Sequence, residues 1–153
     1  MVKMYLFLMV CVSAFCAAGK EKVYPSNHED KIGQQILYYV NLDRKAKGLK
    51  PLALNSMESS VASKHSQDMA SGKVPFGHQG LDDRAKMIRK ALGKVSLVGE
   101  NVASGQMTAK EAVDGWLHSP GHKRNIEGDF TLTGIGWAKG QKGMIYYTQI
   151  FSK

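Results

Sequence analysis

Cysteine is almost missing from this chain of 153 residues, and both copies, Cys11 and Cys16, lie within the first sixteen positions. The rest of the sequence therefore has no thiol and no disulfide, and packing alone must stabilise it. The length compensates for this lack, because a chain of this size can bury a substantial core as one domain. A disulfide-stapled miniature scaffold is excluded.

Long hydrophobic runs are missing as well, with one exception near the start. Met4 to Phe15 is an apolar run of 12 residues that follows Lys3, and small residues allow cleavage after Ala18. This pattern predicts a signal peptide over residues 1–18, too short to anchor the chain in a bilayer. A lipoprotein alternative would acylate Cys16, but bulky Phe15 precedes it. We expect an exported protein, secreted or periplasmic, with no transmembrane segment.

Acidic residues are scarce relative to basic ones: 13 against 21, which gives a formal charge of +8. Removal of Lys3 with the signal peptide lowers this to +7. A positive field favours anionic partners such as teichoic or lipid head groups and other envelope polymers, although a solvated charged face is the simpler interpretation. No aromatic interleaving or nucleic-acid signature accompanies the charge, so we expect no nucleic-acid partner.

What the sequence contains is a mixture of helical and strand patterns after a short basic linker over residues 19–25. Helical spacing of apolar residues covers 28–47, 57–70, 81–92 and a stretch that begins after Thr108. Strand patterns cover 95–103, 131–138 and 144–151. The expected capping residues are Ser26 with Glu29, Asn55 or Ser56, and Thr108 with Glu111. We predict that Pro120 and Gly121 end the fourth helix and that residues 49–54 are an apolar connector.

Six short motifs occur in a fixed order between about His28 and Phe151. They are Asn41-Leu42-Asp43-Arg44 with Gly48-Leu49-Lys50-Pro51-Leu52, Ser66-Gln67-Asp68-Met69-Ala70, Phe76-Gly77-His78, Gly99-Glu100-Asn101-Val102-Ala103, Trp116-Leu117-His118-Ser119-Pro120-Gly121-His122, and Tyr146-Tyr147-Thr148-Gln149-Ile150-Phe151. In this order they resemble the CAP superfamily of cysteine-rich secretory proteins, antigen 5 and plant pathogenesis-related proteins, and most closely its disulfide-free, bacterial-type SCP-like branch. The resemblance defines a domain over 26–153.

The resemblance implies an α+β fold, a three-layer α-β-α sandwich with a mostly antiparallel central sheet. It also implies a cleft that holds two histidines and two acidic residues in the animal and plant members. His78 matches the first histidine and Glu100 the glutamate of the Gly-Glu-Asn motif. Ser119 replaces the second glutamate and Tyr146 the second histidine, so only half of the set is retained. His122 is particular to this branch, and we expect it to substitute for the second imidazole.

Three chemical interpretations of His78, Glu100 and His122 remain open. Two imidazoles and a carboxylate are a reasonable ligand set for zinc, with one position left for water. The same groups could carry out acid–base catalysis, with an imidazole relayed by the carboxylate. Alternatively, Glu100 accepts hydrogen bonds that hold the surrounding loops, because a buried carboxylate needs such partners. Asn101 is expected to satisfy backbone groups in the turn that follows the strand.

Three functions fit these patterns. The first is a secreted binding or effector module whose cleft takes a lipid, sterol, glycan or protein. The residues expected to form this cleft are His78, Glu100, Asn101, Ser119, His122 and Tyr146. The second is a metal-dependent hydrolase of peptide or cell-envelope polymer that uses His78, Glu100 and His122. The third is a basic adhesion protein with an inert cleft. The resemblance favours the first, a non-enzymatic protein, and we expect a monomer.

Overall fold

The fold is described from a computed structural model, which places residues 31–153. The predicted signal peptide, the linker and the capping pair Ser26 and Glu29 lie outside the described residues, as do both cysteines. Everything below concerns the remaining 123 positions of the domain.

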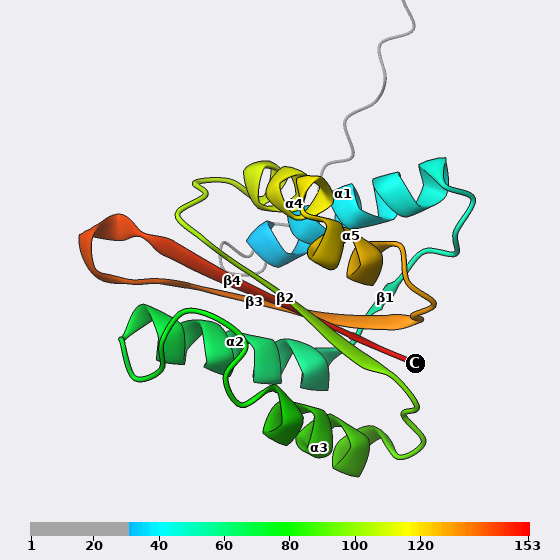
Figure 1. The fold of residues 1–153 in the computed structure, drawn as a ribbon, viewed down its shortest axis with the longest axis horizontal. Helices are drawn as coiled ribbons and strands as arrows, with labels where there is room; N and C mark the ends of the chain where they lie inside the picture. The colour runs from blue at the N-terminus through cyan, green and yellow to red at the C-terminus, as the bar shows by residue number, and fades with distance from the viewer. Residues whose placement is uncertain (1–30) are drawn as a thin grey trace, which may run out of the picture.

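Two layers of helices enclose a four-stranded sheet (Figure 1). One face is covered by α1 (Lys31–Ala46), α4 (Ala109–His118) and α5 (Pro120–Ile126), and the other by α2 (Ser56–Ala70) and α3 (Leu81–Leu92). The strands are β1 (Ala53–Leu54), β2 (Val98–Ser104), β3 (Leu132–Lys139) and β4 (Ile145–Ser152), and a single 3-10 turn, η1 (Gln141–Gly143), joins the last two. This confirms the predicted three-layer α+β sandwich.

The strand order in the sheet is β1-β3-β4-β2. The pairs β3–β4 and β2–β4 are antiparallel, whereas β1 runs parallel to β3. The sheet is therefore mixed and mostly antiparallel. Its two outer strands are β2 along the whole of one edge and β1 along a short part of the other.

Side chains alternate across the sheet and divide the core in two. Tyr147 and Phe151 of β4 point to one face, where they join Trp116 of α4 and residues of α1. Ile150 points to the other face and packs with Ala62 of α2 and Ile88 of α3. Each of these side chains is at most 1% exposed, so both halves of the core are closed to solvent.

Two glycines of β3 let the backbone of α2 lie directly on the sheet. A Cβ at Gly134 would come within 2.1 Å of the Glu58 carbonyl carbon, and one at Gly136 within 2.1 Å of the Ser63 nitrogen. Real Cβ atoms do not approach backbone atoms so closely. The absence of side chains at these two positions therefore sets the distance between helix and sheet.

Helix starts follow the predicted capping residues, and one predicted ending needs correction. The Asn55 side chain accepts a hydrogen bond from the Glu58 amide at 3.1 Å, and the Thr108 hydroxyl accepts one from the Glu111 amide at 3.2 Å. The helix that begins at Ala109 ends at His118, as expected. Pro120, however, opens α5 instead of leading into a loop, because proline is well suited to the first position of a helix.

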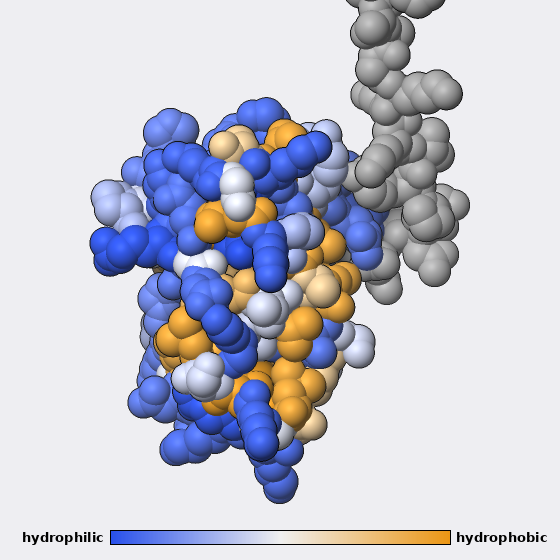
Figure 2. Space-filling view, turned by 90° about the vertical axis from the view of Figure 1, so that its right-hand side faces the viewer, coloured by the Kyte–Doolittle hydropathy of each residue, from blue (hydrophilic) through white to orange (hydrophobic). Residues whose placement is uncertain are grey.

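The outer surface combines charged and apolar residues. On the side where the C-terminus lies, hydrophilic residues cover much of the surface, and apolar ones gather between them (Figure 2). Leu42 of α1 and Leu97 before β2 are 52% and 45% exposed. Among the helices of residues 31–153, none combines the length and apolar character that a membrane span requires.

Glu58 is a buried carboxyl group between α2 and the sheet. It is 0% exposed, one oxygen accepts a hydrogen bond from the Ser152 hydroxyl, and Oε2 has no partner among the described residues. Burial raises the pKa of Glu58, with the Ser152 hydrogen bond opposing this. The folded state therefore binds the proton more tightly than the unfolded chain. The stabilisation that the protonated Glu58 carboxyl group contributes is fully present below the pKa of this group in the unfolded chain. It is lost as the pH rises through the higher pKa of the group in the folded protein.

We therefore expect Glu58→Gln, which carries no charge at any pH, to flatten the pH dependence of stability. At pH 8 the variant should gain about 1 kcal/mol in the free energy of unfolding, because no buried charge has to be accommodated. Urea unfolding between pH 4 and pH 8 measures this. Asp82→Asn, which removes an exposed carboxylate of α3, is the matched control and should keep the wild-type slope. Identical slopes for wild type and Glu58→Gln would contradict the assignment.

Candidate binding cleft at the β2 edge

The candidate cleft surrounds the outer edge of β2. Glu100 and Asn101 are neighbours in this strand, so their side chains point to opposite faces of the sheet. Glu100 meets α3 on one side, and Asn101 meets α5 on the other. The site is thus assembled from both helix layers around a single strand.

Glu100 is the buried centre of the cleft, with a side chain that is 0% exposed. Arg84 of α3 donates two hydrogen bonds to it, from Nε to Oε2 and from Nη2 to Oε1, each 2.7 Å long. Such a bidentate pair supplies the compensation that a buried carboxylate needs. The Glu100 side chain is consequently fixed in position inside the protein.

His78 lies at the surface above this ion pair. Its Nδ1 is 3.0 Å from Oε1 of Glu100, and its side chain is 46% exposed. Because an ionised carboxylate can only accept a hydrogen bond, Nδ1 donates to it, and Nε2 is the nitrogen that carries the lone pair whenever the ring is neutral. Glu100 therefore orients His78 with its second nitrogen available to a ligand.

The loop that carries His78 is anchored from two helices. His65 of α2, which is 4% exposed, places Nε2 2.9 Å from the Gly77 carbonyl oxygen. Arg84 Nη1 donates to the Gln79 carbonyl at 2.9 Å. Burial lowers the pKa of His65, which favours a neutral ring that donates this hydrogen bond. The position of His78 is thus determined by contacts on both sides of it in the sequence.

His122 approaches from the opposite layer, in α5. Its ring centre lies 6.2 Å from that of His78, with the two planes tilted by 46°. Burial lowers the pKa of His122, and the neighbouring His78 lowers it further. Both effects favour the neutral imidazole, which has a lone pair to offer. The two rings are the solvent-accessible part of the candidate site.

Two asparagines join α5 to β2 beneath His122. Asn101 Nδ2 donates to the His122 carbonyl at 3.1 Å. Asn125 Nδ2 donates to the Asn101 side-chain oxygen at 2.8 Å and to the Glu100 carbonyl at 3.0 Å. The second bond satisfies a backbone carbonyl of the edge strand. Asn101 thus satisfies a backbone carbonyl, as predicted, but the carbonyl belongs to α5 and not to the turn that follows β2.

Ser119 and Tyr146 have other surroundings. Ser119 lies between α4 and α5, where its amide donates to the Trp116 carbonyl at 3.1 Å and its carbonyl accepts from Lys123 at 2.8 Å. The Tyr146 ring lies 6.4 Å from the ring of Phe76. The contacts described for these two residues support a helix junction and an aromatic pair, and do not link them to the imidazoles.

Arg84 is the functional residue that the sequence analysis missed, because its charge groups it with the basic residues of the third helix. Leu81, Arg84, Ala85 and Ile88 nevertheless share one helical face by their spacing of three, four and seven residues, and Arg84 is only 7% exposed. A cation on an apolar face indicates a buried partner, and this signal was present in the sequence.

The donors fit a metal ion only in part. Within residues 31–153, no three histidine, cysteine, aspartate or glutamate side chains converge as a possible ligand set. The expected set of His78, His122 and Glu100 is not formed, because the Glu100 carboxylate turns toward Arg84 and His78 Nδ1. What remains is two imidazoles with a carboxylate behind one of them, an arrangement that metal-binding histidines commonly use.

Comparisons with known proteins agree with this architecture. The profile of the Cysteine-rich secretory protein family (CAP) matches residues 37–151. The protein YkwD of Bacillus subtilis is 34% identical over 123 residues, which are 78% of this chain and 47% of the relative. The chain thus spans about half or less of the curated relatives it matches.

Two solved structures share the fold. An extracellular protein containing an SCP domain from Bacillus anthracis is 30% identical, with a TM-score of 0.65, over 86% of this chain and 45% of that one. An outer surface protein from Borrelia burgdorferi is 21% identical, with a TM-score of 0.67, over 80% of this chain and 92% of that one. Together with the family match and the sandwich of Figure 1, these likenesses show that the chain belongs to the CAP superfamily of cysteine-rich secretory proteins, as a bacterial-type SCP-like domain.

Proposed function

We propose that this protein is an extracellular binding module whose point of contact is the imidazole pair of His78 and His122, and that a divalent cation such as zinc binds there. The observation that carries the proposal is the position of Glu100 behind His78, 3.0 Å from Nδ1. It leaves Nε2 as the lone-pair nitrogen of one ring, beside the neutral ring of His122.

Binding is better supported than hydrolysis. A general base must reach a water molecule or a substrate proton. The Glu100 side chain is 0% exposed, and Arg84 occupies both of its oxygens. A carboxylate in this position supports its neighbours, whereas the two imidazoles are left to contact a ligand.

The site has two protein ligands for a cation, fewer than the three or four of most zinc sites in proteins. The remaining positions would be filled by water or by donor groups of a larger ligand, of which a lipid, sterol, glycan or protein head group is the expected kind. The extracellular and outer-surface neighbours support a location outside the cell. The identity of the ligand that the whole protein binds is likewise proposed here.

Zinc titration by calorimetry tests the proposal. We expect one zinc ion per wild-type chain and at least a tenfold loss of affinity in both His78→Ala and His122→Ala. His118→Ala is the matched control, because it removes an exposed imidazole from α4 and should leave affinity unchanged. Glu100→Gln should weaken zinc by about 10- to 100-fold, as is typical when a carboxylate behind a metal-binding histidine is lost.

A wild-type protein that binds no zinc, or a His118→Ala control that loses as much affinity as His78→Ala and His122→Ala, would refute the cation site. Circular dichroism of each variant separates loss of the site from loss of the fold. This matters most for Glu100→Gln, which leaves the Arg84 charge without its partner.

A further inference from the structure

The side of α2 that faces α3 forms a groove with a volume of about 570 Å³. Its α2 wall includes residues three, four and seven positions apart, which share one helical face: Val61, Lys64, His65 and Asp68. Arg84 and Met87 form the α3 wall, and the loop between the two helices contributes Val74 and Gln79. His78 belongs to the same loop, so the groove and the imidazole pair share one segment of backbone.

His65 lines this groove although it is only 4% exposed. Its Nε2 lies 2.9 Å from the Gly77 carbonyl oxygen, which can only accept, so Nε2 carries the proton of the ring. Burial lowers the pKa of His65 and favours the neutral form, in which Nδ1 holds a lone pair. Among residues 31–153, Nδ1 has no hydrogen-bond partner, and it is not among the atoms that are sealed from solvent. An acceptor at the groove therefore lacks a donor.

The charged side chains of the groove are already paired. Lys64 donates to Oδ2 of Asp68 at 2.6 Å, and Lys73 lies 3.4 Å from the same carboxylate. Arg84 is held by Glu100. Among the lining residues that the structure describes, no Lys, Arg or Asp charge is left to pair with an ionic ligand, so the groove favours a neutral one.

The other lining side chains supply an apolar surface. Val61 and Val74 are half-buried, and Met87 is 52% exposed. A methionine thioether makes favourable contacts with aromatic rings. The volume of the groove lies in the range of about 300–1,000 Å³ that is typical of small-molecule sites. A ring with one polar group matches this combination of apolar walls and a single acceptor.

We propose that this groove binds a neutral aromatic alcohol, with its ring between Val61, Val74 and Met87 and its hydroxyl donating to Nδ1 of His65. The hydroxyl supplies the donor that the imidazole lacks. An aromatic ether of the same shape would fill the same space and leave Nδ1 without a partner, which is costly for an acceptor that the ligand covers. The hydroxyl therefore selects the ligand.

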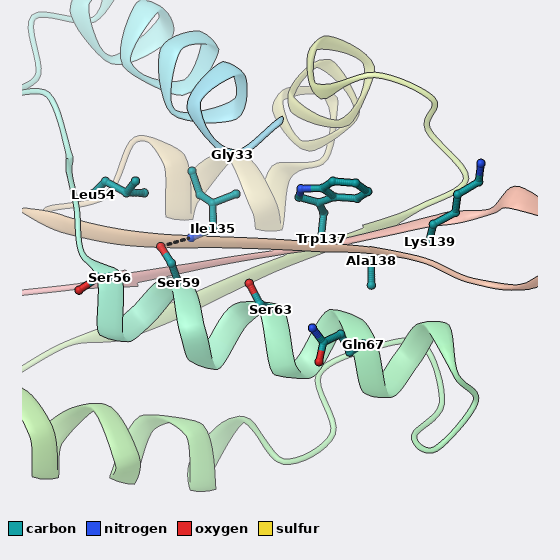
Figure 3. A pocket seen from close by; sticks show the side chains of 10 residues that line it. All are labelled: Gly33, Leu54, Ser56, Ser59, Ser63, Gln67, Ile135, Trp137, Ala138 and Lys139. Carbon is teal, nitrogen blue, oxygen red and sulfur yellow. Dashed lines mark hydrogen bonds between the residues drawn. The ribbon is translucent and has the colours of Figure 1, made fainter. Parts of the chain in front are cut away.

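The groove on the other side of α2 makes no such demand. It has a volume of about 680 Å³ and lies beside β3, with Ser59, Ser63 and Gln67 along it (Figure 3). There the Ile135 amide donates to the Ser59 hydroxyl at 3.2 Å, so the backbone group that faces the helix has its partner. The ligand is therefore assigned to the groove between α2 and α3.

Occupancy of the groove would steady the loop that carries His78. The His65 ring would accept a hydrogen bond at Nδ1 while it donates one to the Gly77 carbonyl, and linked hydrogen bonds of this kind strengthen each other. The ligand would also contact Val74 and Gln79 of the loop. Binding should therefore slow the local opening of residues 76–80. The site itself does not depend on the proposed cation site.

The probe is p-cresol, titrated into the metal-free protein and followed by NMR. We expect saturable amide shifts around residues 61–65, 77–80 and 87, with a Kd on the order of 1 mM for so small a molecule. The Nδ1 resonance of His65 should move, since that atom accepts the hydrogen bond. Amide exchange over residues 76–80 should slow by about threefold or more at saturation. The matched probe is 4-methylanisole, which has no donor and should bind about tenfold more weakly.

Side-chain variants separate the acceptor from the rest of the groove. His65→Gln retains an amide that can donate to Gly77 and removes Nδ1, so p-cresol should lose about tenfold in affinity and bind no better than 4-methylanisole. Met87→Ala should weaken both probes by about threefold. Met107→Ala is the matched control, because Met107 is 64% exposed and does not line the groove. Thermal unfolding confirms that each variant folds.

Several results would overturn the proposal. One is equal affinity of the wild-type protein for the two probes, and another is a preference for p-cresol that survives in His65→Gln. Shifts confined to residues around Ile135 would place the ligand in the β3 groove. Tighter binding of the anion 4-methylbenzoate than of p-cresol would show that the groove selects charge. Because no zinc is present in these titrations, their failure would leave the cation site untouched.

Discussion

Gly136→Ala is expected to cost about 4 kcal/mol or more in the free energy of unfolding, a large part of the stability of a typical domain. The added methyl group would lie 2.1 Å from the Ser63 nitrogen and 2.4 Å from the Ala62 carbonyl carbon. Backbone atoms in the middle of a helix cannot yield as a flexible side chain can. The whole of α2 must move away from the sheet, which also disrupts the hydrogen bond from the Ser66 hydroxyl to the Gly136 carbonyl.

Gly115→Ala provides the matched control for this prediction. Gly115 lies in α4, where an added Cβ has only the Gln106 side-chain nitrogen at 3.9 Å. Because alanine favours helix over glycine, the control should gain about 0.5–1 kcal/mol. Urea unfolding of both variants measures the difference. A Gly136→Ala protein within 1 kcal/mol of wild type would mean that α2 does not rest on β3 as described.

Arg44→Met should cost about 3 kcal/mol, because it leaves four backbone carbonyls without their donor. Arg44 is 2% exposed at the end of α1. Its guanidinium donates to the carbonyls of Lys50, Ile126, Gly128 and Phe130 at distances of 2.7 to 3.2 Å. Burial lowers the pKa of Arg44, and the charges of Asp129 and Asp43 oppose this. One side chain thus joins the first helix to the segment that follows it and to the distant connection between α5 and β3.

Lys45→Met, which removes the exposed neighbouring cation, should change stability by less than about 0.5 kcal/mol. Hydrogen exchange gives the local test. Residues 126–131 and 48–52 should exchange faster in Arg44→Met, beyond what the global loss explains. Arg44→Lys should remain destabilised, since an ammonium group on a straight stem cannot reach four carbonyls in different directions. Full stability of Arg44→Lys would show that charge, and not geometry, is what matters there.

Local signals in the sequence were sufficient for much of the fold. The third helix, Leu81 to Leu92, was predicted with the bounds it has, because apolar spacing and flanking glycines agree. Strand β1 was not predicted, since two residues of an apolar connector become a strand only through pairing with β3. Pro120 was treated as a stop, although the same ring geometry that ends one helix suits the start of the next.

The members of the candidate site were predictable only in part, because the contacts of Ser119 and Tyr146 do not link them to the imidazoles, and its connections were not predictable. The resemblance identified His78, Glu100 and His122, and the structure brings them to one strand edge. That Glu100 binds Arg84 and supports His78 depends on the side on which α3 packs, which no local pattern of residues 98–104 contains. The helical spacing of Arg84 with Ala85 and Ile88 was the nearest available indication, and it required reading a charged residue as part of the inner face.

The way in which the cleft encircles β2 has a mechanical consequence. His78 is suspended from the layer of α2 and α3, and His122 from the layer of α4 and α5, so the two rings meet beyond the rim of the sheet. A ligand that binds both rings would cross-link the two helix layers at this edge of the sheet. The layers could then not separate at the β2 edge unless the ligand dissociated first. Ligand binding would therefore increase the resistance of the described domain to unfolding, in which no disulfide joins the two layers.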